Sequence, residues 1–230
     1  MLAHQLGGVL QPVLGRLQSE PTRQVDGFLR AQRVLSSVAV PICVARAIVA
    51  EPLFRMLFDA RWQPAAPIFA LLSLMLGFHA NVGPSMACLR AQRRFRMLLA
   101  WQLTHLLVAG PVLHLTIISS GATGAALAAL GLWGISAPIG MWLCTTRIEG
   151  RFSRCIVIPM RAWLIGIVVG LPGWLACAWI DDHGRIGEAL AVLVIGPLTA
   201  IAGIALSAGT DETVREALAR AWDGLRPRVR

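Results

Sequence analysis

The chain contains no lysine and no tyrosine, and it has little charge of either sign. Only 14% of its 230 residues are charged, whereas 56% are hydrophobic. A soluble domain carries about 25% charged residues. With a mean hydropathy of +0.66, this chain has too few polar side chains to cover a water-facing surface. The composition therefore predicts an integral membrane protein.

The positive charge comes from arginine alone and gives a formal net charge of +9. A nucleic-acid-binding domain gathers such residues in a stripe on one polar face. Here the arginines form short clusters between apolar runs. This placement argues against a nucleic-acid-binding protein.

The five cysteines show no CxxC or Cys/His spacing of the kind that predicts a disulfide framework or a metal site. We interpret each as a small buried apolar residue. We therefore expect neither a metal nor a cofactor.

The apolar runs have the length of about 20 residues that a bilayer requires of a helix. The sequence predicts an all-α fold, a polytopic transmembrane helical bundle with six spans and an N-terminal partial span. The partial span is residues 1–15, the bundle residues 16–208 and the tail residues 209–230. The six spans are residues 34–57, 64–88, 97–118, 122–146, 156–180 and 188–208.

Seventeen of the 21 arginines lie in alternate connections and in the tail. These groups fall within residues 16–33, 90–96, 147–161 and 215–230. Basic residues stay on the cytoplasmic side of membrane proteins. We therefore expect a multi-pass protein of the cell inner (plasma) membrane with a cytoplasmic C-terminus. The tail from Asp211 to Leu225 has apolar residues at helical spacing and predicts an amphipathic helix on the inner membrane surface, with a partner-docking helix as the alternative.

Arg46 lies deep in the first span, within the segment from Leu29 to Ile68 around which the chain is arranged. A charge at the centre of a span costs roughly 2.5–3.5 kcal/mol unless it faces protein or water. Its side chain could instead extend to the interface. We expect Arg46 to face a cavity.

Four further polar residues in the spans are candidates for the same cavity: His79, Asn81, Gln102 and His105. Gln102 and His105 are three apart and so share a helix face. A local helix break is expected where Asn81 precedes Gly83-Pro84. With Arg46, the set could meet sugar hydroxyls or a phosphate. The alternative for each is an internally hydrogen-bonded packing residue.

The sequence has no motif that predicts an enzyme. No paired carboxylates lie within a span, and there is no nucleophile elbow or P-loop. The outer connections are too short to build an active site. Asp181-Asp182-His183 could bind a metal, but such a run at a loop tip is more often a solvated turn.

Two groups of residues carry a family resemblance. They are Gln11-Pro-Val-Leu-Gly-Arg-Leu-Gln18 with Pro21, and Met56-Leu-Phe-Asp-Ala-Arg-Trp62 followed by Ala65-Ala-Pro67. This combination resembles the polysaccharide-transporter branch of the multidrug/oligosaccharidyl-lipid/polysaccharide exporters, the flippase-like proteins of O-antigen, capsule and exopolysaccharide synthesis.

The resemblance implies a helical transporter of two pseudo-symmetric bundles that alternates access to a central cavity, here a C-terminal lobe like that of the superfamily's multidrug exporters. The implied partner is a polyprenyl-pyrophosphate-linked oligosaccharide in the lipid bilayer. The family has 12 to 14 spans, so we expect this chain to be the C-terminal half, with a missing N-terminal half or another polysaccharide-assembly protein as partner. Two alternatives stay open: a non-transporting membrane scaffold or gene remnant, and a small-solute or multidrug exporter of the same superfamily.

Overall fold

The computed structural model describes residues 10–146, 152–180 and 184–225, and this part of the chain is helical without a strand. A short helix over residues 10–16 is the part of the expected partial span that is described. The helices that follow are α2 (Pro21–Ile48), α3 (Ala50–Leu57), α4 (Ala65–His79), α5 (Val82–Ala91), α6 (Phe95–Thr145), α7 (Phe152–Ile180), α8 (Gly184–Leu190), α9 (Gly196–Thr210) and α10 (Glu212–Leu225). A 3₁₀ turn (Ala60–Trp62) follows α3, and a π-helical segment (Ala191–Ile195) joins α8 to α9.

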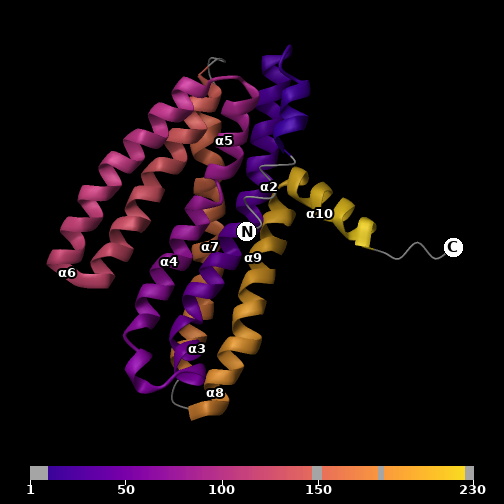
Figure 1. Ribbon diagram of the computed structural model, residues 1–230. Coiled ribbons are helices and arrows are strands. Elements are labelled where there is room, and N and C mark those ends of the chain that lie inside the picture. The colour runs from indigo at the N-terminus through magenta and orange to yellow at the C-terminus, as the bar shows by residue number, and fades with distance from the viewer. Residues whose placement is uncertain (1–9, 147–151, 181–183, 226–230) are drawn as a thin grey trace.

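Helix α2 is the central element and packs against α4, α5, α7, α9 and α10 (Figure 1). It begins at Pro21, well before the apolar run that predicted its start, and proline suits the first helical turn. Val25 and Phe28 are buried in the core, whereas Arg30 is exposed. The basic segment is therefore the amphipathic first part of α2. The predicted first span also divides at Val49, which separates α2 from α3.

The predicted helix break in the second span is confirmed. Helix α4 ends at His79, and α5 begins at Val82. Pro84 lies in the first turn of α5, where no backbone N–H is needed for helical hydrogen bonding.

Helix α6 is two arms joined at Gly121. That residue has φ 62° and ψ −150°, a conformation that glycine adopts at low cost. Figure 1 shows the chain doubling back there, at the tip of a hairpin. At 1.5 Å per residue, residues 95–120 and 122–145 each extend roughly 36–39 Å, enough to cross a hydrocarbon core of about 30 Å.

Within the described residues, five helical segments are long and apolar enough to cross a membrane, with α6 counted as one. The all-α, multi-pass membrane fold is therefore confirmed. Six spans remain a prediction, because that number requires both arms of α6 to cross.

Glycines bring the central helices into close contact. A Cβ atom at Gly170 would lie 2.7 Å from Val44 Cγ1, and one at Gly203 would lie 2.6 Å from Pro41 Cβ. The GxxxG pair Gly166 and Gly170 therefore packs α7 against α2 within the chain. Such close packing is a main source of helix association in membranes.

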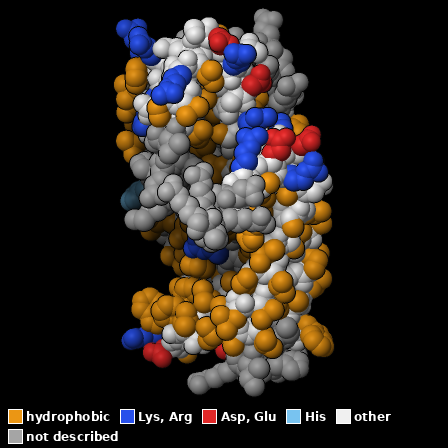
Figure 2. Space-filling model, turned by 90° about the vertical axis from the view of Figure 1, so that its right-hand side faces the viewer, with side chains coloured by type: hydrophobic (Ala, Val, Ile, Leu, Met, Phe, Trp, Pro, Cys, Tyr) orange, Lys and Arg blue, Asp and Glu red, His pale blue; other side chains and the backbone are white. Residues whose placement is uncertain are grey.

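Apolar and charged side chains are distributed over the surface as expected of a membrane protein. Leu107, Ile118 and Trp179 are 72%, 71% and 74% exposed. Figure 2 shows apolar side chains over much of one face, with Arg, Asp and Glu gathered mainly toward one end.

Candidate functional site

Polar and aromatic side chains from α4, α5 and α6 line a cavity of about 240 Å³, here named the imidazole–indole cavity. Its lining residues are His79, Val82, Gly83, Met86, Trp101, Gln102, His105, Trp133 and Ser136. Three of the five predicted site residues, His79, Gln102 and His105, thus lie together. The two arms of α6 and the α4–α5 break position them.

Trp133 from the second arm of α6 contacts both histidines. Its ring centroid lies 4.4 Å from that of His79, edge to face, and 4.6 Å from that of His105. Such separations are favourable for pairs of aromatic rings. Trp133 therefore positions two imidazoles on one wall.

The indole of Trp101 is held in a fixed place. Its Nε1–H donates a hydrogen bond of 3.1 Å to Ser136 Oγ. A Cβ atom at Gly140 would lie 2.4 Å from Trp101 Cη2, so only glycine fits beneath the ring. The Trp101–Ser136 pair therefore joins the two arms of α6.

None of the lining side chains is Asp, Glu or Arg. Imidazoles, an amide and a hydroxyl supply hydrogen-bond donors and acceptors, and the indoles supply flat apolar surfaces. Gln102 is exposed, and its Nε2 lies 3.5 Å from Met86 Sδ. The cavity is suited chemically to a ring that carries hydroxyl groups.

Asn81 lies outside this cavity, in a buried network between α2 and the α4–α5 break. Gln32 Nε2 and Ser36 Oγ each donate to Asn81 Oδ1 at 2.5 Å. Asn81 Nδ2 donates to the carbonyl of Gly77 at 3.1 Å, and Ser85 Oγ donates to the carbonyl of Asn81. Its side chain therefore satisfies backbone groups at the break, as interrupted membrane helices require.

Arg46 is also outside the imidazole–indole cavity. Its guanidinium lies on an exposed part of α2, 5.2 Å from the ring centroid of Phe69, within cation–π range. The five predicted residues therefore occupy three places: the cavity, the Asn81 network and the surface between α2 and α4.

Sequence reasoning missed Trp101, Trp133 and Ser136. The predicted cavity residues were all charged, imidazole or amide side chains, and no indole or hydroxyl side chain was among them. The available signal was the spacing of Trp133 and Ser136, which are three apart and so share one face of the second arm.

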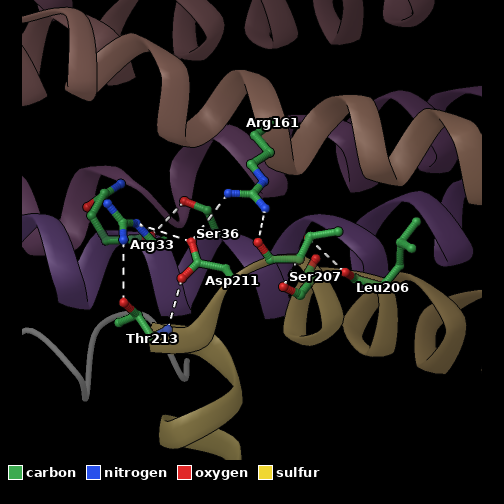
Figure 3. A network of polar contacts seen from close by, with 9 residues as sticks. Arg33, Ser36, Arg161, Leu206, Ser207, Asp211 and Thr213 are labelled. Atoms are coloured by element: carbon green, nitrogen blue, oxygen red, sulfur yellow. Dashed lines mark hydrogen bonds and ion pairs between the residues drawn. The ribbon is translucent and has the colours of Figure 1, made fainter.

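A second polar cluster, which sequence reasoning also missed, connects α2, α7 and the α9–α10 junction (Figure 3). Asp211 Oδ2 lies 3.4 Å from Arg33 Nε and 3.5 Å from Arg161 NH1. Its side chain is only 11% exposed. Asp211 Oδ1 accepts a hydrogen bond of 3.0 Å from the Thr213 backbone N–H, in the first turn of α10. We name the side chains of Arg33, Arg161 and Asp211 the Asp211 cluster.

The described ranges 10–146, 152–180 and 184–225 hold no group of three His, Cys, Asp or Glu side chains placed to bind a metal. Asp181-Asp182-His183 lies outside these ranges.

Comparison with known proteins shows a partial similarity to polysaccharide biosynthesis proteins. Residues 1–67 match a family described as "Polysaccharide biosynthesis protein". No solved structure matches significantly.

Two relatives match over 164 residues. A Klebsiella pneumoniae protein described as "Uncharacterized membrane protein in cps region" is 24% identical, over 71% of this chain and 33% of its own length. The Bacillus subtilis "Teichuronic acid biosynthesis protein TuaB" is 23% identical, over 70% of this chain and 33% of its own length. The chain thus spans about a third of the length of these relatives. The predicted resemblance is confirmed: the chain is similar to polysaccharide-transporter-like membrane proteins.

Proposed function

We propose that this chain is a lobe of a flippase that moves a lipid-linked oligosaccharide across the cell inner membrane during cell-surface polysaccharide biosynthesis. The observation that carries the proposal is the imidazole–indole cavity, because a wall of indole and imidazole rings with hydrogen-bonding neighbours suits a sugar ring. The similarity to a polysaccharide biosynthesis family and to a teichuronic acid biosynthesis protein supports a role with glycans.

The proposed topology has six spans, with both arms of α6 crossing and the C-terminus in the cytoplasm. The arginine clusters support this orientation. Helix α10 then lies at the inner membrane surface, and its exposed Trp222 is suited to the membrane interface.

We assign Arg46 to a surface that faces a second helical bundle. The structure places Arg46 in the last turn of α2, two residues before the helix ends at Ile48, and not at the middle of the span as the sequence predicted. Its exposed guanidinium is costly against lipid and requires protein or water beside it. The relatives have about two thirds of their length outside the matched region, enough for such a bundle. There Arg46 supplies positive charge along the path of an anionic lipid-linked sugar. The proposal assigns no covalent reaction to the chain.

The test is retention of a polyprenyl-pyrophosphate-linked oligosaccharide by the purified chain in nanodiscs, measured by native mass spectrometry. We expect His105→Ala to weaken retention about two- to tenfold through loss of a ring contact and a hydrogen-bonding group. His114→Ala is the matched control, because His114 is exposed on the same arm and does not line the cavity. Equal retention by both variants would remove the cavity from the mechanism.

Export is tested separately in a bacterial host that lacks its own polysaccharide exporter. Surface polysaccharide restored by the chain, alone or with a second bundle from a relative, supports the flippase function. Restored tolerance to toxic small solutes without surface polysaccharide would favour the small-solute exporter, and failure of both would favour the scaffold.

A further inference from the structure

A second cavity adjoins the imidazole–indole cavity on the α6 hairpin. It has a volume of about 350 Å³ and is here named the α6 groove. The groove lies between the two arms, lined by Met97, Ala100, Trp101, Thr104, His105, Val108, Leu132, Ile135, Ser136, Ile139 and Leu143.

The two cavities share three lining residues: Trp101, His105 and Ser136. The same three side chains therefore border both cavities, which lie next to each other. Because Trp101 is fixed by Ser136 and by Gly140, this shared wall has a defined position. A molecule that extends past His105 would touch both cavities.

The chemistry of the two cavities differs. The imidazole–indole cavity has His79, Gln102 and Trp133 on its walls, which suit a hydroxyl-bearing ring. The α6 groove is mostly aliphatic, with Ile135 65% exposed and Val108 47% exposed along it. These exposures show that the groove is open at the surface of the hairpin, where a hydrocarbon chain could enter from the bilayer.

We propose that one amphiphile occupies both cavities, with its sugar ring against Trp133 and its hydrocarbon chain in the α6 groove. The linkage between ring and chain then passes the shared wall, where His105 and Ser136 supply hydrogen-bonding groups. Bulk lipid in the groove alone would leave the neighbouring polar cavity without a ligand. This inference rests on the proposed function and deepens it, since it places the hydrocarbon chain of the transported lipid-linked sugar on α6.

The probe is a dodecyl maltoside analogue with a photoreactive diazirine in its alkyl chain. It is added to the protein in phosphatidylcholine nanodiscs. Mass spectrometry of the labelled peptides locates the alkyl chain. We expect labelling within residues 97–108 and 132–143, blocked by excess dodecyl maltoside but by neither maltose nor dodecanol alone. If dodecanol blocked labelling as well as dodecyl maltoside does, the proposal would be overturned, because the groove would then bind a hydrocarbon chain whether or not it carries a sugar.

Two variants test the joint occupancy. Trp133→Ala should lower labelling of the groove roughly two- to tenfold, because it removes the ring contact in the other cavity. Trp179→Ala, which removes an indole that lines neither cavity, should leave labelling unchanged. Ile135→Trp narrows the groove from a partly exposed position and should also lower labelling, without removing packed core atoms.

Unchanged labelling in both Trp133→Ala and Ile135→Trp would overturn the inference, whether or not either variant is less stable. The outcome is separable from that of the proposed function. Groove labelling without polysaccharide export would leave the inference standing and count against the flippase, whereas export without groove labelling would reject the inference alone.

Discussion

At the scale of the residue, the wall between the two cavities depends on the absence of a side chain at Gly140. A Cβ atom at Gly140 would lie only 2.4 Å from Cη2 of the Trp101 indole, which is closer than two carbon atoms can pack. Overpacking of this kind costs typically about 1–3 kcal/mol. We therefore expect Gly140→Ala to lower the free energy of unfolding by that amount and to displace Trp101 from Ser136, measured by thermal unfolding in nanodiscs and by tryptophan fluorescence.

The matched control for Gly140→Ala is Gly131→Ala on the same arm of α6. A Cβ atom at Gly131 would meet nothing within 4 Å. Alanine is favoured over glycine in a helix by about 0.8–1 kcal/mol, so this variant should be neutral or slightly more stable. Equal destabilisation by the two substitutions would show that Trp101 is not held by Gly140.

At the scale of the element, Asp211 connects the start of α10 to two other helices. One carboxylate meets Arg33 of α2 and Arg161 of α7, whose side chains are 36% and 44% exposed. Because solvent screens both arginines in part, we expect Asp211→Asn to cost about 1–2 kcal/mol, toward the low end for charge-assisted hydrogen bonds. The measurements are thermal unfolding and faster proteolysis within residues 211–225.

Glu216→Gln provides the comparison for the Asp211 cluster. Glu216 pairs with Arg220 at 3.2 Å on the exposed side of α10. An exposed pair of this type contributes about 0.3–0.5 kcal/mol. In this variant α10 should therefore resist proteolysis as it does in the unmodified protein. If Glu216→Gln and Asp211→Asn increased proteolysis equally, the cluster would not be what holds α10.

At the scale of the whole molecule, the proposed topology is tested by thiol labelling in intact cells. In a Cys177→Ser background, Ser119→Cys at the tip of the α6 hairpin should react with a membrane-impermeant maleimide. Arg93→Cys, in the turn between α5 and α6, should react only after the cells are permeabilised. The four other cysteines are buried and should contribute little background. The reverse pattern would contradict the cytoplasmic assignment of the arginine clusters.

The sequence by itself determined the solvent in which this protein folds, the helical class and the position of most helices. These properties depend on the composition of local segments: a long apolar run requires a membrane, and a helix is the structure that satisfies its own backbone there. The break at Asn81 was also readable, because glycine and proline follow within three residues. The early start of α2 could not be predicted from hydropathy, because its first turns lie outside the apolar run. They are stabilised by burial of Val25 and Phe28 in the core.

Only the tertiary structure decided which polar residues meet. Asn81 is two residues from His79 in sequence, yet Asn81 turns to Gln32 of α2 while His79 contacts Trp133 of α6. The turn at Gly121 brings Trp133 back to His105, and close packing fixes the wall between the two cavities. Hydropathy and spacing describe each helix separately, whereas a cavity is formed by the faces that several packed helices leave between them.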